Sequence, residues 1–394
     1  MSIEGRDEAT GSRQLKLGMV GGGQGAFIGA VHRMAVRLDG RFELVAGALS
    51  SDPETAHASA ADLGISPDRS YASFEDMARQ ESERSDGIDA VAIVTPNNLH
   101  YSACKAFLRS GINVVCDKPL TVSMDEALDL ARIVDESSLV FVLTQNNTGY
   151  PMVRQAREMI AAGVLGDVRI VRVSYVQDWL TTALELEGQK QAAWRMDPTQ
   201  AGAGGAIADI GVHAFNLAEF MTGLKLESVC ADLQSFGKGR ELDDNANVLL
   251  RYEGGARGTL WATQIAPGKN NALTIGVYGD KGGIEWNGEE NDYLRFTPLG
   301  EPPRIIARGG AGASEAAANA TRMPAGHPEG YIEGFANLYA LAADLISGSG
   351  NGGPLTSDEL PGIKAGLSGM RFIAACLASS KDGGSWTSLE DAST

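Results

Sequence analysis

The first apolar segment of the chain ends in a run of glycines, and this feature constrains the fold more than any other. Leu15 to Val20 is mostly apolar, Gly21-Gly22-Gly23 follows, and a helix-compatible segment continues to His32. A strand, a glycine turn and a helix bring backbone N–H groups and a helix N-terminus close to a pyrophosphate. Glycine suits such a turn because a Cβ would block both the tight backbone and the approach of the phosphate. The segment therefore predicts a dinucleotide-binding domain.

The spacing of these glycines fits a dinucleotide fingerprint in two ways. Gly21-x-Gly23-x-x-Ala26 has the G-x-G-x-x-G/A form, and Gly29 can instead serve as the third glycine after a three-residue insertion. An ordinary glycine-rich loop is the alternative, but a second apolar strand at 42–49 follows at the distance that this fold requires. The candidates for cofactor binding here are Gly21, Gly23, Gln24, Gly25, Ala26 and Phe27, with Ser50 after the second strand.

Strand and helix patterns alternate through the N-terminal third of the chain, which predicts a doubly wound parallel sheet, the Rossmann arrangement. Ile88 to Thr95, for example, is apolar and β-branched, as buried parallel strands are. The predicted strands are 15–20, 41–49, 88–95, 112–116 and 140–144, and the predicted helices include 56–63, 101–110 and 123–137.

The alternation of strands and helices ends near Asn147, and strands with period-two alternation of apolar and polar residues follow one another after it. Such strands predict an open, mostly antiparallel sheet with helices on one face. Residues 228–284 are predicted to form a meander, and the Gly/Ala-rich stretch 306–328 a mobile loop. The predicted organisation is an α/β chain with a disordered tail at 1–13, a Rossmann domain at 14–145, and a substrate-binding and oligomerisation domain at 146–394.

Length and charge narrow the class of protein. With 394 residues the chain is expected to form more than one domain, and its net charge of −17 disfavours nucleic acids and anionic membranes as partners. The start of the chain has no signal-like apolar region, and no run of 18 apolar residues occurs. The four cysteines show no CxxC spacing, so we expect a reduced, cytoplasmic protein without a zinc site.

Two predicted strands end in loops with polar residues, which is where a parallel sheet places its site. These loops begin with Thr95-Pro96-Asn97 and with Asp117-Lys118-Pro119. A lysine held at a strand end can bind a substrate hydroxyl or carry its proton. A solvated lysine on a loop is the alternative, and the tripeptide alone favours it because charged loop residues are normally exposed.

A second constellation lies in the segment from Gly204 to His213. Asp209 and His213 are four residues apart, so a helix would place them on one face, among apolar neighbours. A histidine with a pKa near neutrality is the usual general base. Three alternatives stay open: a structural Asp–His hydrogen bond, a pair of metal ligands, or a glycine-rich helix start without chemistry. Upstream, Trp194-Arg195 can line a sugar pocket or form an ordinary rim.

Taken in this order, the glycine turn, Thr95-Pro96-x-x-x-His100, Asp117-Lys118-Pro119, Trp194-Arg195 and Gly204-Gly205-x-x-x-Asp209-x-Gly211-x-His213 resemble the Gfo/Idh/MocA family of sugar and inositol dehydrogenases. The resemblance covers about residues 15–380. It implies NAD(P)-linked oxidation or reduction of a sugar, sugar derivative or cyclitol. It also implies a homodimer or homotetramer built on the open sheet face.

The resemblance implies roles residue by residue. Lys118 matches the lysine of the family's E-K-P signature, written D-K-P here, and with Asp209 and His213 it forms the implied catalytic set. The implied cofactor contacts are Gly21, Gly23, Thr95, Pro96, Asn97, His100, Asp117 and Lys118. The implied substrate contacts are Lys118, Trp194, Arg195, Asp209, His213, Asn216 and Tyr150, with His327 as a further candidate in the 306–328 loop.

The expected mechanism is hydride transfer between the nicotinamide and a carbon bearing a secondary hydroxyl, with Lys118 and His213 meeting over the nicotinamide ring. NAD is favoured because no basic side chain follows the second strand, although the ribose-binding acid is also missing there and NADP stays an alternative. Two other functions remain open. One is a sugar enzyme with tightly held NAD and no net redox change; the other is a non-catalytic NAD(P)-sensing regulator.

Overall fold

The computed structural model describes residues 13–349 and 353–390, which form two compact units. Unit 1 comprises the chain up to Asn146 together with Tyr331–Leu367, and unit 2 comprises Asn147–Gly330 together with the chain from Ser368. The tail expected at 1–13 lies outside the described residues except for Arg13, whose guanidinium pairs with Asp89.

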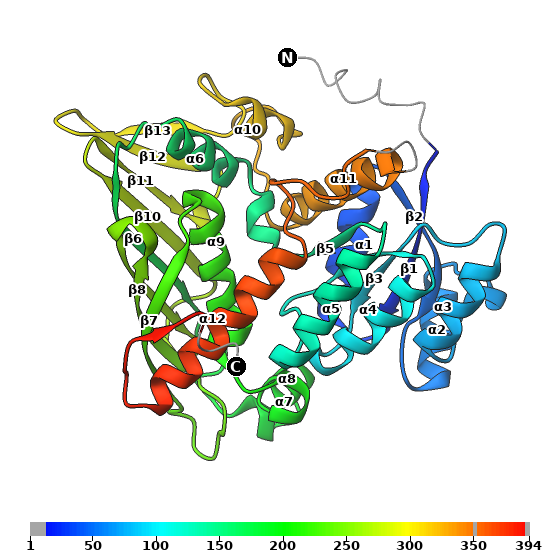
Figure 1. The fold of residues 1–394 in the computed structure, drawn as a ribbon. Helices are drawn as coiled ribbons and strands as arrows, with labels where there is room; N and C mark the ends of the chain where they lie inside the picture. The colour runs from blue at the N-terminus through cyan, green and yellow to red at the C-terminus, as the bar shows by residue number, and fades with distance from the viewer. Residues whose placement is uncertain (1–12, 350–352, 391–394) are drawn as a thin grey trace. The chain divides into compact units, whose positions relative to one another are not determined.

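Unit 1 is built on a five-stranded parallel sheet, so the predicted Rossmann arrangement is confirmed (Figure 1). The strand order is β2-β1-β3-β4-β5. The strands are β1 (Leu15–Gly21), β2 (Phe42–Ala48), β3 (Ala90–Val94), β4 (Asn113–Cys116) and β5 (Phe141–Leu143). The helices are α1 (Phe27–Leu38), α2 (Pro53–Asp62), α3 (Phe74–Glu83), α4 (His100–Arg109) and α5 (Met124–Glu136).

Local sequence explains where these elements begin and end. The side chains of Asp52, Ser73 and Ser123 each accept a hydrogen bond from a backbone N–H of the first turn, and so begin α2, α3 and α5. Every residue of β3 is buried, as its continuous apolar run predicts. Gly21 is in register with Val94, and Ile93 with Cys116, so the loops after β1, β3 and β4 emerge side by side.

A late helix belongs to unit 1, which differs from the expected assignment of 146–394 to one domain. Helix α11 (Tyr331–Ser349) packs on α1 and contributes Phe335 and Tyr339 to the core of the N-terminal sheet. His32 on α1 fixes this contact: its Nδ1 lies 2.8 Å from the Tyr339 hydroxyl, and its ring lies 4.9 Å from that of Phe335. Because the apolar face of α11 is buried against α1, this helix belongs to unit 1 although it follows most of unit 2 in the sequence.

Unit 2 is built on a nine-stranded sheet in the order β13-β12-β11-β10-β6-β9-β8-β7-β14. The predicted meander at 228–284 is interrupted, because β6 lies between β9 and β10 and runs parallel to β9. All the other pairings in this sheet are antiparallel among the described residues. The strands are β6 (Val168–Val176), β7 (Leu226–Gln234), β8 (Asn245–Tyr252), β9 (Arg257–Thr263), β10 (Ala272–Gly279), β11 (Gly282–Asn287), β12 (Tyr293–Pro298), β13 (Arg304–Ala307) and β14 (Thr387–Ser388).

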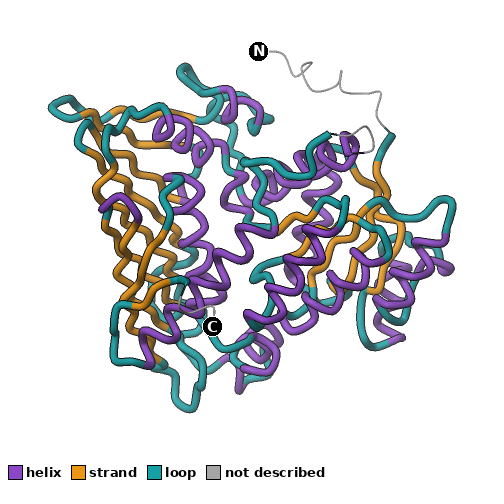
Figure 2. Tube along the Cα trace, viewed as in Figure 1, coloured by secondary structure: helices purple, strands orange, loops and turns teal. Residues whose placement is uncertain are grey.

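Helices lie along one face of this sheet (Figures 1 and 2). They are α6 (Pro151–Ala161), α9 (Val212–Thr222) and the part of α12 (Ile363–Lys381) that belongs to unit 2; the short helices α7 (Lys190–Arg195) and α8 (Pro198–Ala201) lie at one end. On the strands, Ile170, Leu249 and Trp261 are large apolar residues that remain exposed. The sheet therefore keeps one covered and one open face, as its alternating sequence predicts.

The segment predicted as a mobile loop at 306–328 is instead folded around a buried arginine. Arg308 is 1% exposed, and its guanidinium contacts the carboxylates of Asp292 and Glu329 and the carbonyl oxygens of Met323 and His327. Helix α10 (Glu315–Asn319) lies within the same segment. The Gly/Ala-rich composition gave no sign of this polar core, because the carboxylates that pair with Arg308, those of Asp292 and Glu329, lie outside the segment.

Candidate active site

The glycine turn after β1 has the geometry of a phosphate cradle. Gly21 and Gly22 have φ of +77° and +74°, a region that favours glycine. A Cβ on Gly29 would lie 2.4 Å from the Cα of Gly22, so α1 can approach the turn only because Gly29 has no side chain. Gly29 thus performs the packing role of a third glycine. A Cβ on Gly23 would lie 2.7 Å from the carbonyl oxygen of Leu49, so this turn also abuts the end of the second strand.

The N-terminus of α1 is open to an anion. Ala26 precedes the helix without a side-chain cap, and the first turn carries no acidic residue. A Cβ on Gly25 would meet no described atom within 4 Å, so space remains beside the turn. Backbone N–H groups at an uncapped helix start bind phosphate readily. These residues fit the pyrophosphate of a dinucleotide.

The loop after β2 holds its acidic residue in a structural role. Asp52 Oδ1 accepts hydrogen bonds from the backbone nitrogen and the hydroxyl of Thr55, at 2.8 and 2.6 Å. The hydroxyl of Ser50 accepts from the backbone nitrogen of Asp52 at 3.1 Å. Asp52 therefore caps α2, and Ser50 remains the candidate ribose contact on this loop.

His100 connects the loops that follow β3 and β4. Its Nδ1 lies 2.7 Å from the carbonyl oxygen of Pro119 and its Nε2 lies 3.1 Å from that of Thr95. Burial lowers the pKa of His100, against the opposing field of Asp117. Both ring nitrogens thus face protein carbonyls, so we now expect His100 to hold the loops in place rather than to bind a cofactor through its ring nitrogens.

Thr95, Asp117 and Lys118 stand at the ends of β3 and β4. The Thr95 hydroxyl is buried and makes no hydrogen bond within the described part of the chain. The Thr144 hydroxyl donates to Asp117 Oδ1 at 2.7 Å. Burial opposes ionisation of Asp117, but the fields of His32 and Lys118 and the Thr144 hydrogen bond outweigh it and hold its pKa below the usual range. Lys118 is half-buried, beside this carboxylate.

The Asp209 carboxylate in unit 2 accepts hydrogen bonds from Arg195 and Gln264. Its Oδ2 accepts from Arg195 Nε at 3.2 Å and from Gln264 Nε2 at 2.8 Å. Asp209 lies in a π-helical turn, Ile207–Gly211, that leads directly into α9. Sequence spacing predicted an ordinary helix here; π-turns of this kind are frequent at functional sites.

His213 lies in the first turn of α9, where its ring contacts unit 2 on two sides. Its Nδ1 is 3.3 Å from Asn147 Nδ2, and its ring lies 6.0 Å from that of Tyr175 in an edge-on arrangement. Burial, together with the field of Asp209, raises the pKa of Tyr175 to about 12, so this phenol stays neutral at physiological pH.

Trp194 and Arg195 contact each other and the Asp209 cluster. The Arg195 guanidinium lies 4.2 Å from the centre of the Trp194 ring and 5.9 Å from that of Trp179. Its Nη1 also donates to Gln191 Oε1 at 2.7 Å. The structure therefore brings Trp194, Arg195 and Asp209 together, as a polar group flanked by indole rings.

The other predicted substrate contacts are more dispersed. Asn216 is buried on α9, one turn after His213. Tyr150 is buried with its ring 5.4 Å from that of Trp286. His327 is exposed, and its backbone carbonyl oxygen and nitrogen contact Arg308 and Pro324. These positions favour Asn216 over His327 as part of the site.

Sequence reasoning missed Asn147 and Gln264. Both are buried and make polar contacts with the predicted catalytic residues. The signal for Asn147 was present, since 144–148 reads Thr-Gln-Asn-Asn-Thr and all five residues are buried. A buried polar run of this length requires partners. Gln264 stands at the end of an ordinary strand and carried no such signal.

No group of three or more His, Cys, Asp or Glu in 13–349 and 353–390 could hold a metal ion. No described helix is long and apolar enough to cross a membrane.

A parallel sheet whose first strand ends in a glycine turn and an uncapped helix start is the arrangement of a dinucleotide-binding domain. Residues 15–145 match the family model for an oxidoreductase family with an NAD-binding Rossmann fold, and residues 153–285 match the GFO/IDH/MocA C-terminal domain. The chain belongs to the Gfo/Idh/MocA oxidoreductase family, which confirms the resemblance.

Three relatives align over nearly the whole chain. An oxidoreductase from Sinorhizobium meliloti is 51% identical, over 95% of this chain and 99% of that one, with a TM-score of 0.86. An inositol dehydrogenase homolog from Azotobacter vinelandii, complexed with NADH and myo-inositol, is 34% identical, over 96% and 98%, with a TM-score of 0.90. The uncharacterized oxidoreductase YfiI of Bacillus subtilis is 34% identical, over 96% and 98%.

Proposed function

We propose that this protein is an NAD-dependent dehydrogenase that oxidises a secondary hydroxyl of a cyclitol or a ring-closed sugar. The observation that carries the proposal is the cluster of Asp209, Arg195 and Gln264 one turn before His213. A carboxylate, an amide and a guanidinium beside indole rings suit a ligand with several hydroxyls and an apolar ring face. The Azotobacter vinelandii homolog, with NADH and myo-inositol, supports this class of substrate.

In the proposed reaction His213 accepts the hydroxyl proton of the substrate as general base. Asn147 determines which nitrogen can do so. Nε2 is the base when the Asn147 amide presents its oxygen to Nδ1–H. Proton uptake then gives an imidazolium that keeps this hydrogen bond and returns the proton from Nε2 in the reverse reaction.

Lys118 donates a hydrogen bond to the same substrate oxygen and stabilises negative charge as the proton leaves. Asp209 accepts a hydrogen bond from a neighbouring hydroxyl, which orients the ring. NAD, when bound, supplies the hydride acceptor. The cradle 21–27, Ser50, Thr95, Pro96 and Asn97 hold it in this proposal.

The experiment is absorbance at 340 nm with NAD or NADP and a panel of myo-inositol, other cyclitols, levoglucosan and pyranoses. We expect NADH formation with at least one ring polyol and weaker activity with NADP. Lys118→Ala and His213→Ala should each lower kcat/KM by roughly 100- to 10,000-fold, the range for general acid–base groups. Wild-type rates in both variants would refute the assignment.

The same assay separates the other functions. Product formation without accumulation of NADH, with NAD retained through gel filtration, would indicate a reaction without net redox change. Tight NAD binding without turnover of any polyol would indicate a regulator. We also expect a homodimer or homotetramer, measured by light scattering, because the open sheet face carries exposed apolar side chains such as Trp261.

A further inference from the structure

A buried carboxylate holds the start of the segment that carries Asp209 and His213. Asp243, just before β8, is 7% exposed. Its Oδ1 accepts from the backbone nitrogen of Gly205 at 2.6 Å, and its Oδ2 from that of Ile207 at 2.8 Å. Its own carbonyl oxygen accepts from the nitrogen of Ala206 at 2.7 Å. Three consecutive N–H groups of one turn therefore bind a single residue.

Gly205 shows how closely the two backbones approach. A Cβ at this position would lie 2.0 Å from the carbonyl oxygen of Asp243, closer than any side chain could come. The second glycine of the Gly204-Gly205 pair is thus explained by contact with Asp243, two residues before the π-turn begins.

The next residue, Asp244, holds Gln264, which binds the Asp209 carboxylate. The carbonyl oxygen of Asp244 accepts from the backbone nitrogen of Gln264 at 3.0 Å, and Gln264 Nε2 donates to Asp209. Residues 243 and 244 therefore fix both the turn that contains Asp209 and the amide that binds its carboxylate.

We propose that Asp243 is a positioning residue whose ionised carboxylate sets the register of the π-turn, and thereby the placement of Asp209 and His213. This inference rests on the proposed function of those two residues. A carboxylate can accept from both N–H groups, whereas a neutral carboxyl or an amide offers one good acceptor oxygen and leaves one N–H poorly paired.

The charge of Asp243 depends on pH in the range of enzyme assays. Burial raises its pKa to about 6, and Asp244 adds to the shift, while the backbone hydrogen bonds oppose it. The groups that face it are Asp244, the Cys376 thiol on α12 and, through Asp244, the Arg240 guanidinium. Because the folded turn raises this pKa above the ordinary value that an open turn would restore, the folded turn binds the proton more tightly, and its opening free energy should rise as pH falls through about 6.

Asp280 offers a control in the same unit. Its Oδ1 accepts from the backbone nitrogen of Asp167 at 2.9 Å, just before β6 begins. The His213 ring contacts Tyr175, near the other end of that strand. Asp280→Asn thus changes a carboxylate that accepts from a backbone nitrogen into an amide, away from the site segment.

The experiment compares the wild type, Asp243→Asn and Asp280→Asn by steady-state kinetics and by hydrogen exchange of residues 203–210. We expect Asp243→Asn to lower kcat roughly 10- to 100-fold, the scale of an ångström-level misplacement, with the Kd of NAD unchanged within about twofold. Asp280→Asn should keep kcat within about threefold. Protection of 203–210 in the wild type should rise between pH 7 and pH 5, after correction for intrinsic exchange rates, and this rise should be absent in Asp243→Asn.

Equal loss of kcat in the two variants, or wild-type kcat in Asp243→Asn, would overturn the inference while leaving the proposed function intact. If the wild type oxidises no polyol, the proposed function fails and the exchange data alone decide the role of Asp243. If Asp243→Asn does not fold, pH-independent protection of 203–210 in the wild type would still refute it.

Discussion

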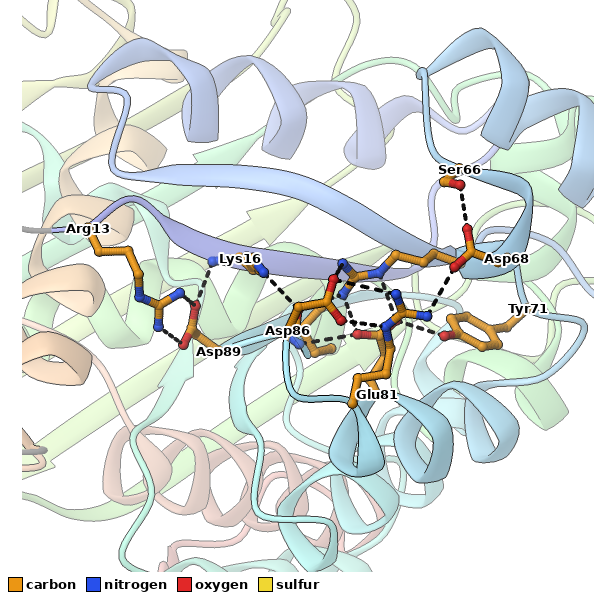
Figure 3. A network of polar contacts seen from close by, with 11 residues as sticks. Arg13, Lys16, Ser66, Asp68, Tyr71, Glu81, Asp86 and Asp89 are labelled. Atoms are coloured by element: carbon orange, nitrogen blue, oxygen red, sulfur yellow. Dashed lines mark hydrogen bonds and ion pairs between the residues drawn. The ribbon is translucent and has the colours of Figure 1, made fainter.

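Two guanidinium–carboxylate pairs, one in each unit, serve different ends. In unit 1, Glu81 on α3 accepts from Arg69 through both oxygens, from the Tyr71 hydroxyl at 2.7 Å and from the backbone nitrogen of Ile88 at 3.2 Å. Figure 3 shows Glu81 at the centre of this network, with Tyr71 pointing at it. Its side chain is fully buried, and that of Arg69 is 8% exposed.

In unit 2, the pair of Arg195 and Asp209 is only partly enclosed. Their side chains are 22% and 19% exposed. Gln264 also donates a hydrogen bond to Oδ2 of the Asp209 carboxylate. A carboxylate with all its acceptor positions used by protein can only stabilise the fold. A carboxylate that keeps contact with solvent can exchange water for a ligand hydroxyl at little cost. Exposure, more than pairing, therefore distinguishes the candidate site from the scaffold.

The largest expected effect follows from removing the buried charge in unit 1. Glu81→Gln leaves the Arg69 guanidinium buried without its anion, and such a change costs roughly 3–5 kcal/mol of unfolding free energy. Urea unfolding measures it. Because Glu81 is in the core of the fold and not in the proposed site, kcat of the folded fraction at low temperature should stay near the wild-type value. A loss below 1 kcal/mol, or a selective loss of kcat, would contradict the comparison.

The pair in unit 2 should show the opposite pattern. Asp209→Asn should lower kcat/KM roughly 100-fold, because it removes a charge that orients the substrate, equivalent to about 2.7 kcal/mol of barrier. Its unfolding free energy should change by no more than about 1 kcal/mol, since Arg195 retains access to water. Kinetics and urea unfolding on the same preparation test both statements. A large loss of stability with unchanged kinetics would make Asp209 a structural residue.

The sequence predicted the elements of unit 1 well because each carries a local signal. The glycines of the turn, the caps Asp52, Ser73 and Ser123, and the apolar run of β3 each act within a few residues. The return of α11 and the insertion of β6 between β9 and β10 were missed, since both depend on contacts far apart in the chain.

The site was predicted in the same uneven way. Lys118, Asp209 and His213 were found through motif resemblance, and their roles remain proposals. Arg308, Gln264 and Asp243 were missed, because a buried polar residue is recognisable only by its partners, and those lie 21, 55 and 38 residues away. His100 was given a cofactor role by its position, whereas its ring nitrogens face the carbonyls of Thr95 and Pro119.

Gln264 is buried like Glu81 but contacts Asp209 in the candidate site, so it combines a feature of each pair. A variant at Gln264 therefore tests the comparison further. Gln264 is fully buried. Gln264→Leu removes the donor to Asp209 Oδ2 and introduces an apolar side chain of similar size. Loss of one hydrogen bond to a charged acceptor should lower the free energy of unfolding by about 1.5–3 kcal/mol. Burial of the apolar leucine side chain offsets part of this loss, so we expect a net decrease of about 1 kcal/mol. Activity should fall roughly tenfold, because Asp209 keeps Arg195. Gln264→Glu should be worse, since it places two carboxylates together.

The smallest effect on stability is expected from removing an exposed arginine, Arg79, on the same helix as Glu81. Arg79 on α3 contacts Asp76 at 2.9 Å and Glu83 at 4.0 Å, with its side chain 58% exposed. Arg79→Gln breaks both contacts, yet water and salt already screen them, so the urea midpoint should stay within experimental error. The variant lies on the same helix as Glu81→Gln and likewise replaces a charged side chain by Gln, but at an exposed position. If Arg79→Gln destabilised the protein as much as Glu81→Gln, helix α3 itself would be the sensitive element, and exposure would not separate structural pairs from functional ones.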